Sequence, residues 1–367
     1  MIETLRLTDL RQDQPGLRRL VHGLATAGTW RRLVSRAFTV IRELLTALPR
    51  DLWRARSAAS TTPPRMELGV RPEGDAVRIA LYVHYSASGR VSGMVRFQLA
   101  QLRALGFAIV FISMAANIPE DEWRAVRHLC ALVVQRQNFG LDFGAWRDLL
   151  PEVRRRWPMV EELLLANDSV LGPIRPLAPL IETMRAGGEG LFGLTESLQG
   201  GPHLQSFMLL ARGPSVVQDV MCFIQKLYIG HSKWLLVQMA EVRLSRWIQR
   251  RGHRVAAVYG YDRLVRAAIA DPSERKRLAL SHRGLRAVDR LPDEKVTAML
   301  HDRPLNPTHH LWHVLATRFG CPFLKTELIR RNPGRLPGVA EWAEVVPPDA
   351  PCQLAVLRAH LTTLEER

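Results

Sequence analysis

The chain has 367 residues, of which 47% are hydrophobic and 23% are charged, as expected for a globular protein with a sizeable core. Its longest apolar runs, such as Ala108 to Ala116, are much shorter than the roughly 20 residues of a membrane-spanning helix, and its N-terminus lacks the apolar core of a signal peptide. The four cysteines are far apart and form no CxxC pair, which argues against a zinc site or a disulfide framework and favours a reducing compartment.

The net charge of +16 comes almost entirely from arginine, with 46 Arg against 5 Lys. Codon bias toward arginine is one explanation. Attraction to anionic lipid or to phosphorylated small molecules is another, because the guanidinium fork binds phosphate in a bidentate way. The basic residues are spread along the chain and form no dense tract with interleaved aromatic residues, so we expect no nucleic-acid partner.

The first predicted element lies in a basic N-terminal segment, residues 1–66. From Thr29 to Leu48 apolar residues recur at helical spacing with arginines between them, and Pro49 marks the end of this amphipathic helix. The helix either packs on the main domain or lies on a membrane surface as a peripheral anchor. Residues 57–65, with the sequence SAASTTPPR, have the composition of a linker.

Strands and helices alternate in the next part of the chain. The strands are predicted at 77–85, 107–115, 130–137 and 160–168, and the helices at 90–106, 118–129 and 143–157. This alternation predicts an α/β fold with an open, mostly parallel, Rossmann-like sheet and flanking helices. In such sheets ligands bind outside the carboxyl ends of the strands.

Beyond residue 180 the pattern is less regular. We predict a strand at 203–211, a helix at 233–252 and a strand at 254–260. A helical C-terminal region follows, in which Asn306 caps a helix that begins at Pro307. The predicted domains are therefore an α/β domain at 77–262 and a C-terminal helical region at 263–367 packed on it.

A glycine turn follows the third predicted strand, with Asn138, Gly140 and Asp142 in the stretch NFGLDFGAW. Glycine allows positive φ and a close approach of the backbone to a ligand. A carboxylate at this position can accept hydrogen bonds from ribose or sugar hydroxyls. The alternative is that Asp142 only caps the following helix.

The fourth predicted strand ends in Asn167-Asp168-Ser169. A carboxylate at the carboxyl end of a strand can hold a divalent ion that bridges a diphosphate. The alternative is an Asx turn that leads into the next loop.

One glutamate, Glu241, lies on the apolar stripe of the predicted helix 233–252. A carboxylate against an apolar wall suits a general base, and the alternative is a buried salt bridge, for example to Arg246. His203 and Gln205 share one face of a predicted strand and could bind sugar hydroxyls, unless His203 is only structural.

Two further histidines, His309 and His313, have the spacing of metal ligands on a helix, but the sequence offers no third ligand. We therefore interpret this pair as part of an ordinary helix.

Five motifs together carry a family resemblance. In chain order they are NFGLDFGAW, LLLANDSVLGP, GLTES with HLQSF, EVRLSRW, and NPTHHLWHVLATRFGCPFLKTELIRRNP. They resemble the rhamnan synthesis F family of bacterial polysaccharide glycosyltransferases, over roughly Val77 to Pro333. The resemblance implies sugar transfer from a nucleotide sugar to a glycan or lipid-linked acceptor during assembly of a cell-surface polysaccharide, such as a rhamnose-containing glycan or lipopolysaccharide O-antigen.

The chain is more distantly similar to inverting glycosyltransferases with the GT-A fold. This similarity implies that the turn with Asn138, Gly140 and Asp142 lies at the nucleotide. It also implies that Asn167 and Asp168 stand in the motif that holds the metal and the diphosphate. The motif has one carboxylate here, where the family's Asp-x-Asp has two, so the need for Mg²⁺ or Mn²⁺ at Asp168 stays open.

The same similarity implies that Glu241 is the catalytic base, with Leu244 and Arg246 in its motif, although Val242 replaces the second acid of the family's pair. We therefore predict a GT-A-like inverting glycosyltransferase in the cytoplasm, which contacts the inner face of the cytoplasmic membrane if the segment 1–66 binds lipid. The alternative is a non-catalytic glycan- or nucleotide-binding component of a polysaccharide assembly complex. The single acid of the metal motif favours that alternative, whereas Glu241 favours catalysis.

Overall fold

A computed structural model describes residues 2–11, 65–70, 73–230, 232–281 and 283–365, together with residues 38, 41, 42 and 45. The predicted basic helix at 29–48 and the predicted linker at 57–65 fall almost wholly outside the described residues. Within the described part of the chain, no helix has both the length and the apolar character needed to cross a bilayer.

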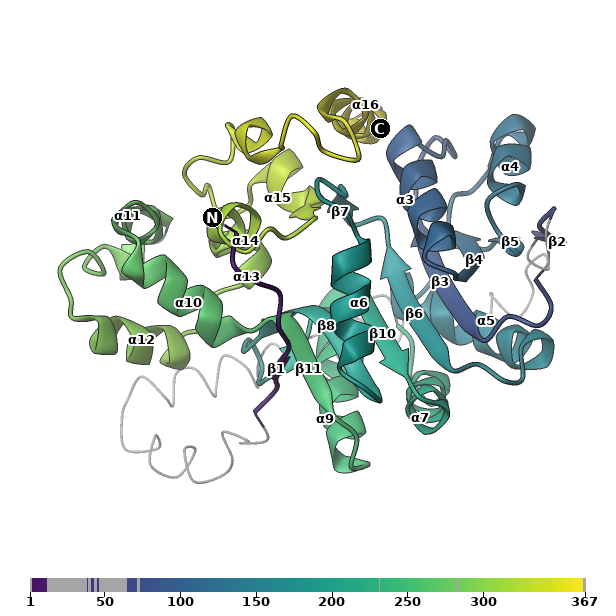
Figure 1. The fold of residues 1–367 in the computed structure, drawn as a ribbon, viewed down its shortest axis with the longest axis horizontal. Coiled ribbons are helices and arrows are strands. Elements are labelled where there is room, and N and C mark those ends of the chain that lie inside the picture. The colour runs from purple at the N-terminus through teal and green to yellow at the C-terminus, as the bar shows by residue number, and fades with distance from the viewer. Residues whose placement is uncertain are drawn as a thin grey trace.

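The four strands predicted first, and the three helices between them, are confirmed and form one side of a mixed sheet (Figure 1). They are β3 (Arg78–His84), α3 (Gly93–Ala104), β4 (Ala108–Ser113), α4 (Glu120–Arg127), β5 (Leu132–Gln135), α5 (Leu141–Arg156) and β6 (Glu162–Asn167). The strands are parallel to one another, in the order β5-β4-β3-β6. Every residue of β4 and β6 is buried, as expected for parallel strands covered on both faces.

The other side of the sheet consists of β10 (Met208–Arg212), β8 (Gly190–Ser197) and β11 (Val255–Tyr259). β10 runs antiparallel to β6 and β8, and β11 runs parallel to β8. Six of these seven strands therefore run in one direction, which confirms a mostly parallel sheet. The strand predicted at 203–211 is divided into β9 (His203–Leu204) and β10, because the chain turns between them.

Two short strands cover the edges of the sheet. β1 (Thr8–Asp9) pairs with β11, and β2 (Arg65–Leu68) pairs with β5, both antiparallel. Thr8 and Asp9 belong to the N-terminal segment 1–66, in which the sequence predicted a helix at 29–48 and a linker but no strand. Their backbone pairs instead with Ala257 and Ala256, and this pairing covers an edge of the sheet that would otherwise be open.

Two hydrophobic clusters lie on the two faces of the sheet because side chains alternate along each strand. Leu164 and Ala166 of β6 belong to the cluster shared with α3, α4 and α6 (Ala178–Ala186). Leu163 and Leu165 belong to the cluster shared with α5, α7 (Pro214–Gln225) and α9 (Val242–Arg250). α3 and α6 cross the face of the sheet turned toward the viewer in Figure 1.

The C-terminal region is mostly helical, as predicted. Its helices are α10 (Tyr261–Ala270), α11 (Pro272–Ser281), α12 (Asp293–Asp302), α13 (Pro307–His310), α14 (Trp312–Thr317), α15 (Thr326–Arg331) and α16 (Leu354–Glu365). Asn306 caps α13 as predicted, since its Oδ1 accepts a hydrogen bond from the Thr308 amide at 3.1 Å. α13 is short, and α14 begins after Leu311 as a separate helix.

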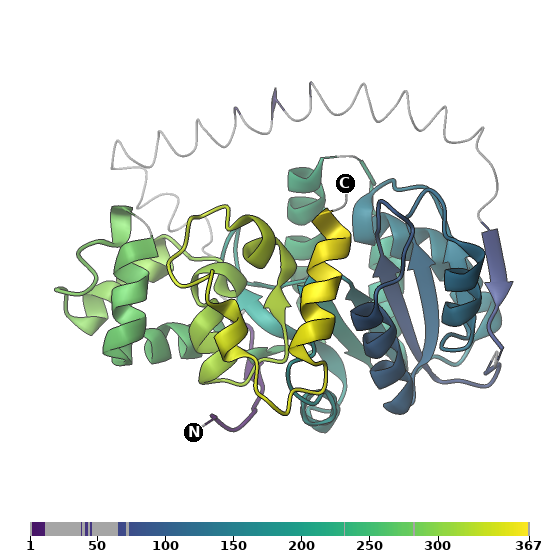
Figure 2. The ribbon, with the colours of Figure 1, turned by 90° about the horizontal axis from the view of Figure 1, so that it is seen from above.

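Two contacts are important for the position of the C-terminal region on the α/β part. β12 (Leu324–Lys325) pairs antiparallel with β7 (Val170–Leu171), which directly follows β6. α16 lies between the other C-terminal helices and α3 in Figure 2, and His360 Nδ1 is 2.8 Å from Ser92 Oγ at the start of α3. These contacts fix the C-terminal region over the carboxyl end of β6.

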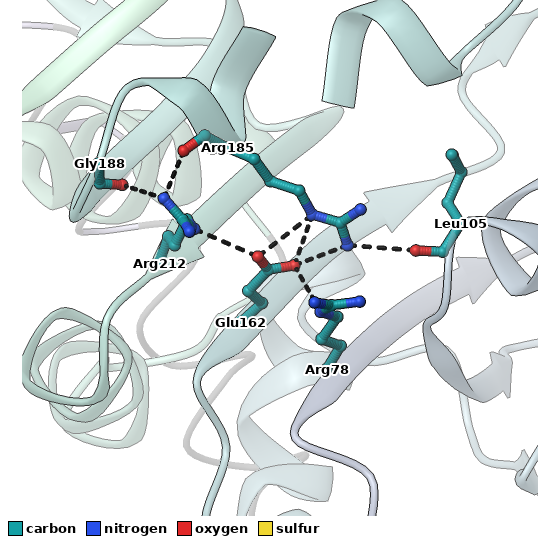
Figure 3. A network of polar contacts seen from close by, with 6 residues as sticks. All are labelled: Arg78, Leu105, Glu162, Arg185, Gly188 and Arg212. Atoms are coloured by element: carbon teal, nitrogen blue, oxygen red, sulfur yellow. Dashed lines mark hydrogen bonds and ion pairs between the residues drawn. The ribbon is translucent and has the colours of Figure 1, made fainter. Parts of the chain in front are cut away.

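An arginine clamp, made of Glu162 with Arg78, Arg185 and Arg212, holds the opposite end of β6 (Figure 3). Glu162 is 5% exposed and accepts hydrogen bonds from Arg185 Nη2 at 2.8 Å and from Arg212 Nε at 3.2 Å. The clamp joins β3, β6, β10 and α6. β6 is therefore fixed at its first residue and carries Asn167 at its last.

A second buried carboxylate, Glu196 in β8, makes stability depend on pH. Burial raises the pKa of Glu196 to about 7 in spite of a hydrogen bond from the Tyr261 amide at 3.0 Å. Between its ordinary pKa of 4.5 and about 7 the folded protein binds a proton that the unfolded chain releases, so stability falls as pH rises through this window.

Glu196→Gln is expected to remove this dependence and to stabilise the protein by up to about 3 kcal/mol at pH 8 relative to wild type, with little difference at pH 4.5. Urea unfolding from pH 4.5 to 8 measures the free energy of unfolding of wild type and of Glu196→Gln. The titration of every other group contributes equally to both proteins and cancels in the difference. The exposed Glu294→Gln is the control, and parallel stability curves for Glu196→Gln and wild type would contradict the prediction.

Candidate functional site

A cavity of about 570 Å³ lies at the carboxyl ends of β3, β4, β5 and β6. Seven of the nine predicted site residues line it: Asn138, Gly140, Asn167, Asp168, Asp142, Gln205 and Glu241. They come from the turn after β5, the end of β6, the loop between β9 and β10, and the helical segment after α7. The predicted position of the site at the carboxyl edge of the sheet therefore agrees with the fold.

The glycine turn has the backbone geometry predicted for it. Gly140 has φ 77°, and a Cβ at this position would lie 1.9 Å from Cγ2 of Ile229, so glycine is required for two reasons. Leu141, the first residue of α5, has φ 50°, a strained value for a residue with a side chain.

Asp142 does not cap α5, because Gly140 occupies the N-cap position. The Asp142 carboxylate accepts a hydrogen bond from Asn167 Nδ2 at 2.7 Å, which joins the turn after β5 to the end of β6. The capping alternative for Asp142 is therefore wrong, and its carboxylate lines the cavity.

The Asn167-Asp168-Ser169 motif contains both an Asx turn and a cavity carboxylate. Asn167 makes the Asx turn, since its Oδ1 accepts hydrogen bonds from the amide and the hydroxyl of Ser169. Asp168 is left facing the cavity, and its Oδ2 accepts a hydrogen bond from the Tyr85 amide at 2.8 Å. Burial, with a smaller effect of Asp142, raises the pKa of Asp168 to about 7.

Glu241 is the last residue of a π-helical segment, Val237–Glu241, between α8 (Lys233–Leu236) and α9. The predicted helix 233–252 is thus a nearly continuous helix interrupted by one π-helical turn. Such turns are frequent at functional sites. Glu241 shares the cavity lining with Leu236 and Val237, and its Oε1 accepts a hydrogen bond from the Ser206 amide at 3.1 Å.

The alternative for Glu241, a salt bridge to Arg246, is wrong. Arg246 Nη2 instead donates to the carbonyl of Gly200 at 3.0 Å. The nearest basic group recorded for Glu241 in the described part of the chain is His203, whose Nε2 lies 4.0 Å from Glu241 Oε1. Burial lowers the pKa of His203, so this histidine is neutral at pH 7.

His203 and Gln205 take different positions, although the sequence placed them on one face. Nδ1 of His203 lies 2.7 Å from the carbonyl of Gly201 and donates to it, which leaves Nε2 as an acceptor directed toward Glu241. His203 is buried behind Glu241, whereas Gln205 lines the cavity, where its Oε1 accepts from Thr195 Oγ1 at 2.8 Å.

The C-terminal region contributes a wall of the cavity that the sequence did not predict. This wall contains three cations, Lys325, Arg330 and Arg331, and one carboxylate, Glu327, together with Asn306 and His309. A signal for Lys325 was present, because only 5 of the 51 basic residues are Lys and this one stands in an arginine-rich chain. His313 points elsewhere, with Nδ1 2.5 Å from Glu274 Oε1, so His309 and His313 are not a metal pair.

The Asn-Asp-Ser motif does not fit a resident divalent metal. Such ions take several oxygen ligands, commonly with one or two carboxylates. The motif has only one carboxylate, Asp168, and Asn167 Oδ1 already accepts two hydrogen bonds from Ser169. The ammonium of Lys325 lies 2.8 Å from Ser169 Oγ, where it would repel a divalent ion. Among the described residues, no group of three or more His, Cys, Asp or Glu side chains is placed to hold a metal ion.

Residues 109–237 match the family model described as rhamnan synthesis protein F, which confirms the resemblance over that range. The match indicates a polysaccharide-related role. It covers the chain from β4 to the start of the π-helical segment, with the turn after β5, the Asn-Asp-Ser motif and His203. Glu241 and the C-terminal wall lie outside it.

Two curated relatives are distantly similar to this chain. The uncharacterized protein y4gN of Sinorhizobium fredii is 26% identical over 195 residues, which cover 52% of this chain and 50% of that protein. The virulence protein VirA of Vibrio anguillarum is 28% identical over 224 residues, which cover 59% of this chain and 68% of that protein. This chain thus spans only half the length of the first relative.

Proposed function

We propose that this chain is a glycosyltransferase that transfers a sugar, rhamnose or another hexose or deoxyhexose, from a nucleotide sugar to a growing cell-surface polysaccharide. The observation that carries the proposal is that Glu241 lines the same cavity as Asp142 and Asp168. The family match over residues 109–237 supports a polysaccharide as the product. The finer assignment to a GT-A-like fold is part of the same proposal.

In the proposed reaction the donor lies against the carboxyl edge of the sheet. Asp142, held by Asn167, accepts hydrogen bonds from the hydroxyls of the nucleotide, and Gly140 lets the backbone of the turn approach it closely. Asp168 and Gln205 face the same space and contact the sugar. Two residues are assigned no contact with the donor: Arg246 donates to a backbone carbonyl, and His203 is buried.

Glu241 is the proposed general base. Its carboxylate is fixed by the Ser206 amide and takes the proton of the acceptor hydroxyl. The acceptor oxygen forms a bond to the anomeric carbon while the bond from that carbon to the diphosphate oxygen breaks, and the electron pair leaves with the nucleoside diphosphate. A single displacement of this kind inverts the anomeric centre.

The proposed acceptor is a glycan or lipid-linked glycan at the cytoplasmic face of the cytoplasmic membrane. The charge of residues 1–66, with 12 Arg against 5 acids, supports contact with anionic lipid. This location is proposed together with the function and depends on it.

Calorimetric titration with a panel of nucleotide sugars tests the donor site. We expect saturable binding of one donor, and a loss of about 10- to 100-fold in affinity for Asp142→Asn, because a charge-assisted hydrogen bond contributes about 1.5–3 kcal/mol. Asp121→Ala, an exposed residue of α4, is the matched control and should bind like wild type. If no donor binds while polysaccharide fragments do, the chain is a glycan-binding assembly component and the proposed function is wrong.

A further inference from the structure

The basic wall of the cavity, Lys325, Arg330 and Arg331, faces the Asn-Asp-Ser motif. Backbone contacts set its position. Lys325 of β12 pairs with Val170 of β7, and the Thr326 amide donates to the carbonyl of Ser169 at 3.2 Å. The main chain of Thr326, next to Lys325, is therefore hydrogen-bonded to the main chain of Ser169, next to Asp168.

Side chains hold the Lys325 ammonium at the motif. Lys325 Nζ donates to Ser169 Oγ at 2.8 Å, Ser169 donates to Asn167 Oδ1, and Asn167 Nδ2 donates to Asp142 Oδ2 at 2.7 Å. Lys325 Nζ also makes a cation–π contact with Phe207, whose ring centroid is 5.3 Å away and which lines the cavity as well. A chain of hydrogen bonds therefore runs from the ammonium, through both outer positions of the motif, to the carboxylate of the glycine turn.

Arg330 is anchored by a hydrogen bond from Nη2 to the carbonyl of Leu364 in α16 at 2.6 Å, and Leu364 itself lines the cavity. Arg331, the last residue of α15, is exposed. One cation of the basic wall is therefore tied to the motif, one to α16, and one lies where the cavity meets solvent.

We propose that Lys325, with Arg330 and Arg331, binds the diphosphate of a nucleotide-sugar donor and supplies the positive charge that a divalent metal supplies at an Asp-x-Asp motif. The inference rests on the proposed function and names the ligand of this wall as a nucleoside diphosphate group. Lysine binds phosphate as a point charge and arginine binds it through a bidentate fork. As the bond to the sugar breaks, negative charge grows on the diphosphate, and fixed cations stabilise it without reorganisation.

The test measures diphosphate binding in the presence of EDTA. The ligands are inorganic pyrophosphate, a panel of nucleoside diphosphates and the matching nucleosides, and the method is calorimetry. We expect wild type to bind pyrophosphate and one nucleoside diphosphate without metal. Lys325→Met should weaken both at least tenfold and leave nucleoside binding unchanged, and Lys325→Arg should stay within a few-fold of wild type.

Two further variants complete the design. Lys295→Met removes an exposed lysine of α12 and should bind like wild type. Asp168→Asn distinguishes the two ways in which a diphosphate could bind. If a metal ion on Asp168 held the diphosphate, this variant would lose binding. If Lys325 holds it, the variant should bind like wild type. Thermal unfolding of Lys325→Met and Lys325→Arg shows whether both are folded.

Binding that requires added Mg²⁺ or Mn²⁺, disappears in Asp168→Asn and persists in Lys325→Met would overturn the inference, as would a wild type that binds no diphosphate in EDTA. The proposed function fails in a different way. In that case Lys325-dependent diphosphate binding is present, but no nucleotide sugar is bound or consumed.

Discussion

Glu241→Gln is expected to slow sugar transfer by a factor of about 10² to 10⁴, the usual contribution of a general base, while donor affinity stays close to that of wild type. The amide of Gln keeps an oxygen that can accept from the Ser206 amide, so the local structure is retained and only proton acceptance is lost. Nucleoside diphosphate released in the presence of extracted glycan acceptor gives the rate, and calorimetry with the donor gives the affinity.

The control for this variant is Glu182→Gln, an exposed carboxylate of α6 that does not line the cavity, which should transfer sugar at the wild-type rate. A Glu241→Gln protein that turns over normally would remove Glu241 from the mechanism. Loss of donor binding together with turnover would instead show that Glu241 holds the donor.

Glu162→Gln is expected to destabilise the protein by about 1.5–3 kcal/mol, because a buried carboxylate loses its charge-assisted hydrogen bonds to Arg185 and Arg212. The Glu162 side chain is 6% exposed, and three guanidinium groups surround it in the arginine clamp. Without the carboxylate they repel one another at the start of β6. Chemical denaturation followed by tryptophan fluorescence measures the loss.

Glu152→Gln is the matched control, since Glu152 also contacts two arginines, Arg155 and Arg156, but on the surface of α5. Surface pairs of this kind contribute about 1 kcal/mol or less. Equal losses for Glu152→Gln and Glu162→Gln would mean that the clamp contributes no more than a surface pair.

The half of the fold from β3 to β6 could be predicted because its strands are continuous apolar runs and its helices are amphipathic. β8 was missed, although it lies in the middle of the sheet. Its sequence, GLFGLTES, contains two glycines and three polar residues, and only its position between β10 and β11 makes it a strand. The antiparallel direction of β10 was missed as well, since tertiary contacts set it.

The site divides in the same way. Asp142, Asp168 and Glu241 stood out because each is an acid in an unusual local setting, and the fold brings all three to one cavity. The roles assigned to them stay predictions. Lys325 and Arg331 lie in LKTELIRR, which reads as an ordinary short helix, and only the pairing of β12 with β7 places them at the motif. The π turn that ends at Glu241 has no sequence signature that we recognise.

The pairing of β12 with β7 also has a consequence for biosynthesis. Lys325 is added to the growing chain 156 positions after Ser169, which takes roughly 10–30 s at ordinary rates of translation. Later in that interval β3 to β6 can already fold, because every strand of that parallel set has been synthesised before the interval begins. The proposed diphosphate site is still missing its cations during that interval, so we expect a nascent chain to bind no diphosphate before residues 325–331 are added.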